Sequence, residues 1–124
     1  MFGYNKRKFP RANYPCSLTM WSENGNSQVI MGYTANIGAG GLCVHITQEL
    51  LIHSYVEVRI EFPSQTTPFK CKGKIAHCDK YVDPQGKKFY AIGVEFEAMD
   101  EVRQAYLMGV VSDLITLNEK AKNN

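Results

Sequence analysis

Apolar and polar residues alternate along several short segments before residue 97, and this pattern predicts β-strands. The clearest case is residues 56–62, where Val56, Val58, Ile60 and Phe62 fall on one face and charged residues take the other. A period of two is typical of a strand with one buried face. The segments assigned in this way are 12–21, 29–37, 41–46, 56–62, 69–78 and 88–96.

Residues 29–37 follow the same alternation, and we interpret them as another half-buried strand. Its shared apolar face would carry Val29, Met31, Tyr33, Ala35 and Ile37. Turn-forming residues separate the strands at 23–26, 38–41, 63–65 and 83–86. Short strands with frequent turns and no helix between them indicate an all-β fold, either an antiparallel barrel or a sandwich.

The pattern changes after residue 96 to a helical one. Apolar residues then recur at spacings of three and four, namely Val102, Tyr106, Val110, Leu114 and Leu117. Asp100 is a suitable N-cap, so we expect one amphipathic helix of about 16–18 residues that packs this stripe on the barrel or on a partner. Residues 119–124 are polar and are expected to form a frayed tail.

The chain of 124 residues is long enough for one domain and too short for two ordinary ones. Its net charge of +2 is unevenly distributed, because Lys6, Arg7, Lys8 and Arg11 precede the first acidic residue, Glu23. A basic arm on a mildly acidic body favours one local anionic partner over a broad nucleic-acid surface. The alternative is a solvated, disordered terminus. We therefore divide the chain into a flexible arm (1–11), one barrel domain with its helix (12–118) and a polar tail (119–124).

The composition also indicates where the protein resides. No apolar stretch is long enough for a secretory signal or a membrane span, which predicts a cytoplasmic protein without membrane insertion. The four cysteines are interpreted as reduced thiols, and their spacing fits no zinc site. The histidines His45, His53 and His77 are scattered and lack an orienting partner, and no catalytic motif is present, so we expect neither an enzyme nor a metal centre.

Two motifs carry the candidate chemistry. Three residues separate Arg7 from Arg11, and Pro10 favours an extended arm in which both guanidinium groups can reach one ligand. Arginine binds phosphate oxygens and the acceptor edge of guanine equally well. Downstream, Asn36, Gly38 and Gly41 belong to a glycine-rich turn, where glycine permits a positive φ and close approach of the backbone to a ligand. Taken alone, the turn is equally an ordinary hairpin connection.

In this order the two motifs resemble the PilZ domain family, which pairs an R-x-x-x-R arm with a [D/N]-x-[S/A]-x-x-G turn. Residues 90–96 also look like the last barrel strand of that family. The resemblance implies a six-stranded antiparallel β-barrel with a C-terminal helix, and cyclic di-GMP as the ligand, without a cofactor. It further implies that Arg7, Arg11, Asn36, Gly38 and Gly41 form the binding site. Gly38 departs from the family's serine or alanine and lacks a hydroxyl contact.

Lys6 is a possible additional ligand contact. On this reading the ligand orders the arginine arm, and a downstream partner protein detects the change. The rival hypothesis is a PilZ-type adaptor that works by protein contacts alone, without nucleotide. A single-stranded nucleic-acid binder would use Lys70, Lys72 and Lys74, but we expect no aromatic residues on that face and therefore no DNA or RNA partner. We expect a monomer or weak dimer.

Overall fold

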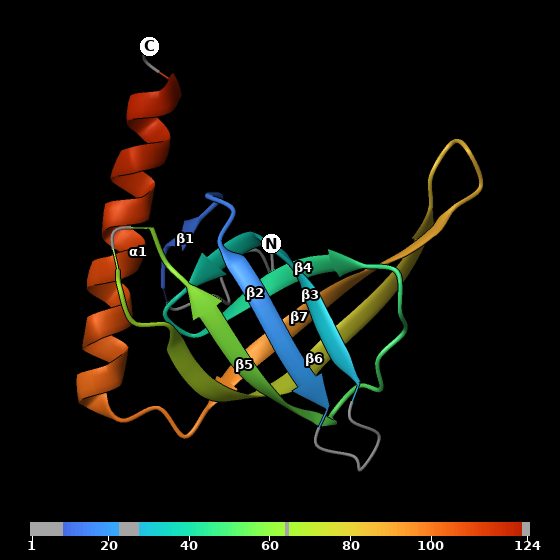
Figure 1. The fold of residues 1–124 in the computed structure, drawn as a ribbon, viewed down its shortest axis with the longest axis horizontal. Coiled ribbons are helices and arrows are strands. Elements are labelled where there is room, and N and C mark those ends of the chain that lie inside the picture. Colours follow the sequence, from blue (N-terminus) through green and yellow to red (C-terminus); the bar gives the residue numbers. More distant parts are fainter. Residues whose placement is uncertain (1–8, 23–27, 64, 123–124) are drawn as a thin grey trace, which may run out of the picture.

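The computed structural model describes residues 9–22, 28–63 and 65–122. They form seven strands and one helix, arranged as a barrel with the helix standing beside it (Figure 1). In chain order the elements are β1 (Arg11–Ala12), β2 (Ser17–Ser22), β3 (Val29–Gly38), β4 (Gly41–Ile46), β5 (Tyr55–Glu61), β6 (Phe69–Val82), β7 (Lys88–Glu97) and α1 (Glu101–Lys122).

Six strands close into an antiparallel barrel. Their order is β3-β2-β5-β6-β7-β4, and β4 pairs back with β3. This confirms the expected six-stranded barrel with a C-terminal helix, and it decides between barrel and sandwich. The seventh strand, β1, pairs with the end of β3 through Arg11↔Gly38 and Ala12↔Ile37. The strand expected at 12–21 is thus two strands, because Pro15 lies in the irregular segment between them and cannot donate to a ladder.

The barrel interior is filled by the inward residues of each strand. The expectation for residues 56–62 is confirmed, since Val56, Val58, Ile60 and Phe62 are all buried. Burial of each such side chain contributes about 1.5–3 kcal/mol to folding. The fully enclosed side chains, at 0% exposure, include Met20, Ile37, Val44, Ile60, Ile75 and Ile92.

The assignment of the buried face of residues 29–37 is wrong for most of the strand. Val29, Met31 and Tyr33 are 49%, 75% and 68% exposed, whereas Ile30 and Thr34 are buried. The register with β2 places Ile30 opposite the buried Met20, which fixes the even-numbered residues inside. A β-bulge between Thr34 and Asn36 then shifts the alternation, so that Ile37 points inward after all.

Helix α1 begins as expected, and the stripe that it buries agrees with the expected one in part. Asp100 caps it, because its carboxylate oxygen Oδ1 accepts a hydrogen bond of 2.8 Å from the backbone N–H of Arg103. The buried residues are Leu107, Val110, Val111 and Leu114. Of the other residues in the expected stripe, Val102 is 78% exposed, and Tyr106 and Leu117 are partly exposed. The ring of Tyr106 nevertheless stacks on Phe69 of β6, with centroids 6.0 Å apart.

The helix is also longer than expected, with 22 residues. Residues 119–122, which we placed in a frayed tail, are helical. It packs against β1 and β3, and its C-terminal end stands clear of the barrel (Figure 1). Within the described residues, no helix is long and apolar enough to cross a membrane.

Candidate functional site

A pocket of about 600 Å³ opens on the outer surface of the barrel, between β1 and β6 and over β4 and β7. This volume lies within the range of small-molecule sites. Three of its lining residues are glycines, so much of its surface is bare backbone. The residues that line it are Phe9, Arg11, Gly38, Gly40, Leu42, Cys43, Ala76, His77, Gly93, Val94 and Glu95.

Arg11 is the arginine that the described structure places at this pocket. Its Nη1 donates a hydrogen bond of 2.6 Å to the side-chain oxygen Oδ1 of Asn36, 25 residues further along the chain. Arg11 belongs to β1 and not to a flexible arm, so the expected boundary of the arm at residue 11 is too late. Pairing with Gly38 and bonding to Asn36 together hold its guanidinium at the pocket.

Arg7 and Lys6 lie outside the described residues. The convergence of two arginines on one ligand therefore stays a prediction, as does any contact from Lys6.

Asn36 owes its position to the bulge in β3. With uninterrupted alternation, an even-numbered residue of this strand would point into the barrel, as Ile30 and Thr34 do. The register shift between Thr34 and Asn36 moves Asn36 out of the core and leaves it half-buried, where it meets Arg11. Bulges commonly redirect a side chain next to a functional site.

The glycine turn is a tight connection through Ala39 and Gly40 between β3 and β4. A side chain at Gly38 would place its Cβ 2.9 Å from the backbone oxygen of Pro10, and one at Gly41 would overlap the carbonyl oxygen of Val94. Among the described glycines, Gly86 alone has a positive φ. The turn glycines are therefore needed for close packing of the chain on itself, and not for the positive φ that we considered.

The three motif residues differ in their relation to the pocket. Gly38 lines it, whereas Asn36 and Gly41 are not lining residues. Asn36 acts through Arg11, and Gly41 is buried against β7, opposite Glu95. The sequence motif therefore includes one residue of the pocket wall, Gly38, and two residues that hold neighbouring parts of the site in place, Asn36 and Gly41.

His77 forms the opposite wall, and the sequence reasoning treated it only as a structural or surface histidine. A second bulge, between Ile75 and His77, turns its ring outward over Gly93, so that a Cβ at Gly93 would overlap the imidazole. The ring nitrogen Nδ1 lies 3.2 Å from Oδ2 of Asp79. A glycine inside a strand often marks such a close approach, so Gly93 is the feature of the sequence that could have indicated it.

Phe9 and Glu95 complete the pocket's chemistry. The ring of Phe9 lies 3.4 Å from where a Cβ of Gly40 would be, and it packs on the core. Glu95 is an exposed carboxylate at the rim. The pocket thus joins one guanidinium, one imidazole, one carboxylate and an aromatic ring, which suits a ligand with both anionic and hydrogen-bond donor groups.

The lysines Lys70, Lys72 and Lys74 lie on β6 away from this pocket. Contrary to expectation, an aromatic residue does accompany them. The Nζ of Lys72 lies 4.8 Å from the ring centroid of Tyr55, and that of Lys74 lies 6.0 Å away. Tyr55 is thus covered by two cations.

A family model for the PilZ domain matches residues 5–111. The chain belongs to the PilZ domain family. The match includes both motifs, all seven strands and the first half of α1. No curated protein sequence matches the chain significantly.

Several solved structures share the fold at low sequence identity. The PilZ domain of YcgR from Escherichia coli, solved with c-di-GMP, has a TM-score of 0.77 at 10% identity, covering 97% of this chain and 99% of that one. The K. pneumonia MrkH–c-di-GMP complex gives 0.72 at 12%, covering 94% and 56%. The Bacillus subtilis inhibitor of motility MotI gives 0.68 at 17%, covering 95% and 57%. The chain therefore spans little more than half of MotI and MrkH.

Proposed function

We propose that this PilZ domain is a receptor for cyclic di-GMP, which it binds without catalysis in the pocket between Arg11 and His77. The observation that carries the proposal is the hydrogen bond that holds Arg11 on Asn36 beside a glycine-lined floor. The ligand is the one named for the YcgR PilZ domain and for the MrkH complex.

The residue roles follow from chemistry. Arg11 would bind a phosphate or the O6 and N7 acceptors of a guanine, and Arg7 would make contacts of the same kind. Glycine backbone at Gly38 and Gly40 lets a flat base approach closely. Glu95 would accept hydrogen bonds from the donor edge of guanine, and His77 offers a flat ring for contact with a base. Lys6 is assigned a supplementary phosphate contact.

The proposed signal is the ordering of the segment before β1. A doubly anionic ligand would draw Arg7 and Lys6 towards Arg11, and the resulting surface of protein and nucleotide would be read by a downstream partner. We place the protein in the cytoplasm, where such a messenger is made. The rival function, an adaptor that works without nucleotide, predicts that this pocket stays empty.

Isothermal titration of the purified chain with cyclic di-GMP tests the proposal, with GTP and cyclic di-AMP as controls. We expect saturable heat with cyclic di-GMP and none with the controls at the same concentrations. Absence of heat with cyclic di-GMP at several temperatures would favour the adaptor. Equal binding of cyclic di-AMP would remove guanine recognition from the account.

A further inference from the structure

The β6–β7 hairpin extends beyond the barrel and has no evident role in its core. Strand β6 runs to Val82, four residues past the expected end at residue 78. Strand β5 pairs with β6 only as far as Lys74, and β4 pairs with β7 only as far as Tyr90. The last rungs of the hairpin, including Tyr81↔Phe89, therefore have no third strand (Figure 1).

One edge of this hairpin is open. Beyond Ile75, which is bonded to His53 and Ser54, the backbone hydrogen bonds of β6 found within the described ranges run to β7 and to the turn alone. Residues 76, 77 and 79–82 are exposed. An edge strand of this length presents unpaired N–H and C=O groups to which an extended segment can add.

The hairpin is held rigid although it buries little. Asp83 Oδ1 accepts hydrogen bonds from the backbone N–H groups of Gln85 at 2.9 Å and Lys87 at 2.8 Å. The rings of Tyr81 and Phe89 stack with centroids 5.5 Å apart. The hydroxyl of Tyr81 lies 2.7 Å from His45 Nδ1 on β4. A surface fixed in advance loses less conformational entropy when it binds a partner.

The charge of the hairpin selects the partner. Lys80, Lys87 and Lys88 are exposed. Its two carboxylates already have partners, Asp79 with His77 and Asp83 with the turn amides. Between residues 76 and 91, three lysines stand against two carboxylates, and this net positive charge complements an acidic segment.

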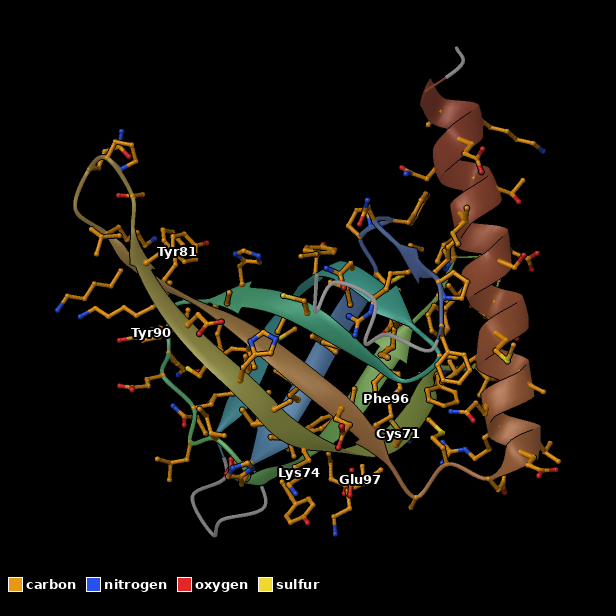
Figure 2. All side chains as sticks on the ribbon, turned by 180° about the vertical axis from the view of Figure 1, so that it is seen from behind. Cys71, Lys74, Tyr81, Tyr90, Phe96 and Glu97 are labelled. Carbon is orange, nitrogen blue, oxygen red and sulfur yellow. The ribbon has the colours of Figure 1, made fainter. Side chains whose placement is uncertain are left out.

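The hairpin also adjoins the pocket. On β6, every second side chain, namely those of His77, Asp79 and Tyr81, lies on the outer face. His77 lines the pocket. Tyr81 contacts the rings of His45 and Phe89. Figure 2 shows Tyr81 on the projecting part of the hairpin. A partner seated along β6 would thus touch the pocket mouth.

We propose that the open edge of β6, residues 76–82, docks an acidic extended segment of a partner protein as an added strand, held by Lys80 and Lys87. The inference rests on the proposed function in one respect only, which is that this partner is the protein that detects the bound cyclic di-GMP. The edge, the rigid aromatic pair and the lysines are present without ligand.

Selection from a phage-displayed library of random peptides about 12 residues long, enough for one strand, tests the proposal on the full chain. We expect the enriched peptides to be acidic and to slow hydrogen–deuterium exchange at residues 76–82. Lys80→Glu should weaken them about tenfold, whereas the matched reversal Lys120→Glu on the exposed helix face should not.

Enrichment of neutral or basic peptides, protection elsewhere, or equal loss in both variants would overturn the docking surface. Cyclic di-GMP titration of Lys80→Glu is the separate readout of the pocket. If the wild type fails to bind the nucleotide while it still binds the acidic peptides, the proposed function fails and the docking surface stands.

Discussion

Arg11 and Gly38 face each other across the β1–β3 pair, and each restricts what the other position can be. Arg11 needs the backbone of β3 close by, because its side chain reaches Asn36 from the paired strand. Gly38 provides that closeness, since a Cβ there would lie 2.9 Å from the backbone oxygen of Pro10. In this chain, the serine that the family usually has at this position would come too close to the backbone of Pro10.

Gly38→Ser is expected to destabilise the protein and not to improve nucleotide binding. The added side chain must displace the backbone at Pro10, an overpacking that costs about 1–3 kcal/mol. Urea unfolding and calorimetry would measure both effects. Gly109→Ser is the matched control, because no atom lies within 4 Å of a Cβ at that helical glycine. A Gly38→Ser variant as stable as the wild type that also binds more tightly would refute the steric account.

Cys71 is a residue whose environment predicts a pH effect. Burial, opposed by nearby Arg103 and supported by Glu57, raises the pKa of its thiol to about 12. The unfolded chain releases this proton near the ordinary thiol pKa of 9.0, whereas the folded chain retains it. The folded state is thus favoured below about pH 9, and this contribution is lost as the pH rises towards 12.

We therefore expect the free energy of unfolding to fall by about 1 kcal/mol between pH 8 and 10 on account of this thiol. Urea unfolding of wild type and Cys71→Ala at both pH values would measure it. The variant should be less stable overall but should lose less stability with pH. Parallel pH dependence in the two proteins would show that the Cys71 thiol ionises equally in both states.

Among the elements, β3 and β6 each carry a bulge, and the two bulges flank the pocket. One turns Asn36 towards Arg11, and the other turns His77 over Gly93. A bulge shifts the alternation of inward and outward side chains, and the hydrophobic pattern of the sequence does not show where this shift occurs. For this reason the buried face of residues 29–37 was assigned wrongly for most of the strand. The buried stripe of the helix was predicted only in part for a related reason. Leu107 and Val111 lie beside Val110 and Leu114, and only tertiary packing shows which apolar residues are buried.

The stripe of α1 is tested by a matched pair of substitutions. Leu107→Ala should lower the free energy of unfolding by about 2–5 kcal/mol, because Leu107 is 0% exposed and its loss leaves a cavity. Val102→Ala should change it by less than about 0.5 kcal/mol, since Val102 is 78% exposed. Thermal unfolding of both variants suffices. A larger effect at Val102 would restore the stripe expected from the sequence.

For the molecule as a whole, the sequence was most informative where patterns are local. The alternation in residues 56–62 and the turn residues predicted the strands, and two motifs predicted the family, because each rests on neighbouring residues. His77 and Glu95 were missed as pocket residues because they come from strands that only barrel closure brings beside Arg11. The exposed face of Val29, Met31 and Tyr33 likewise depends on the register with β2.

The central claim is that Arg11 binds cyclic di-GMP from its position on β1, and calorimetry of Arg11→Ala tests it most directly. We predict a loss of about 1.5–3 kcal/mol of binding free energy, the range for a hydrogen bond to a charged group. Arg59→Ala should bind like the wild type, because Arg59 pairs with Glu61 on β5 and does not line the pocket. Equal affinity of Arg11→Ala and wild type would contradict the account.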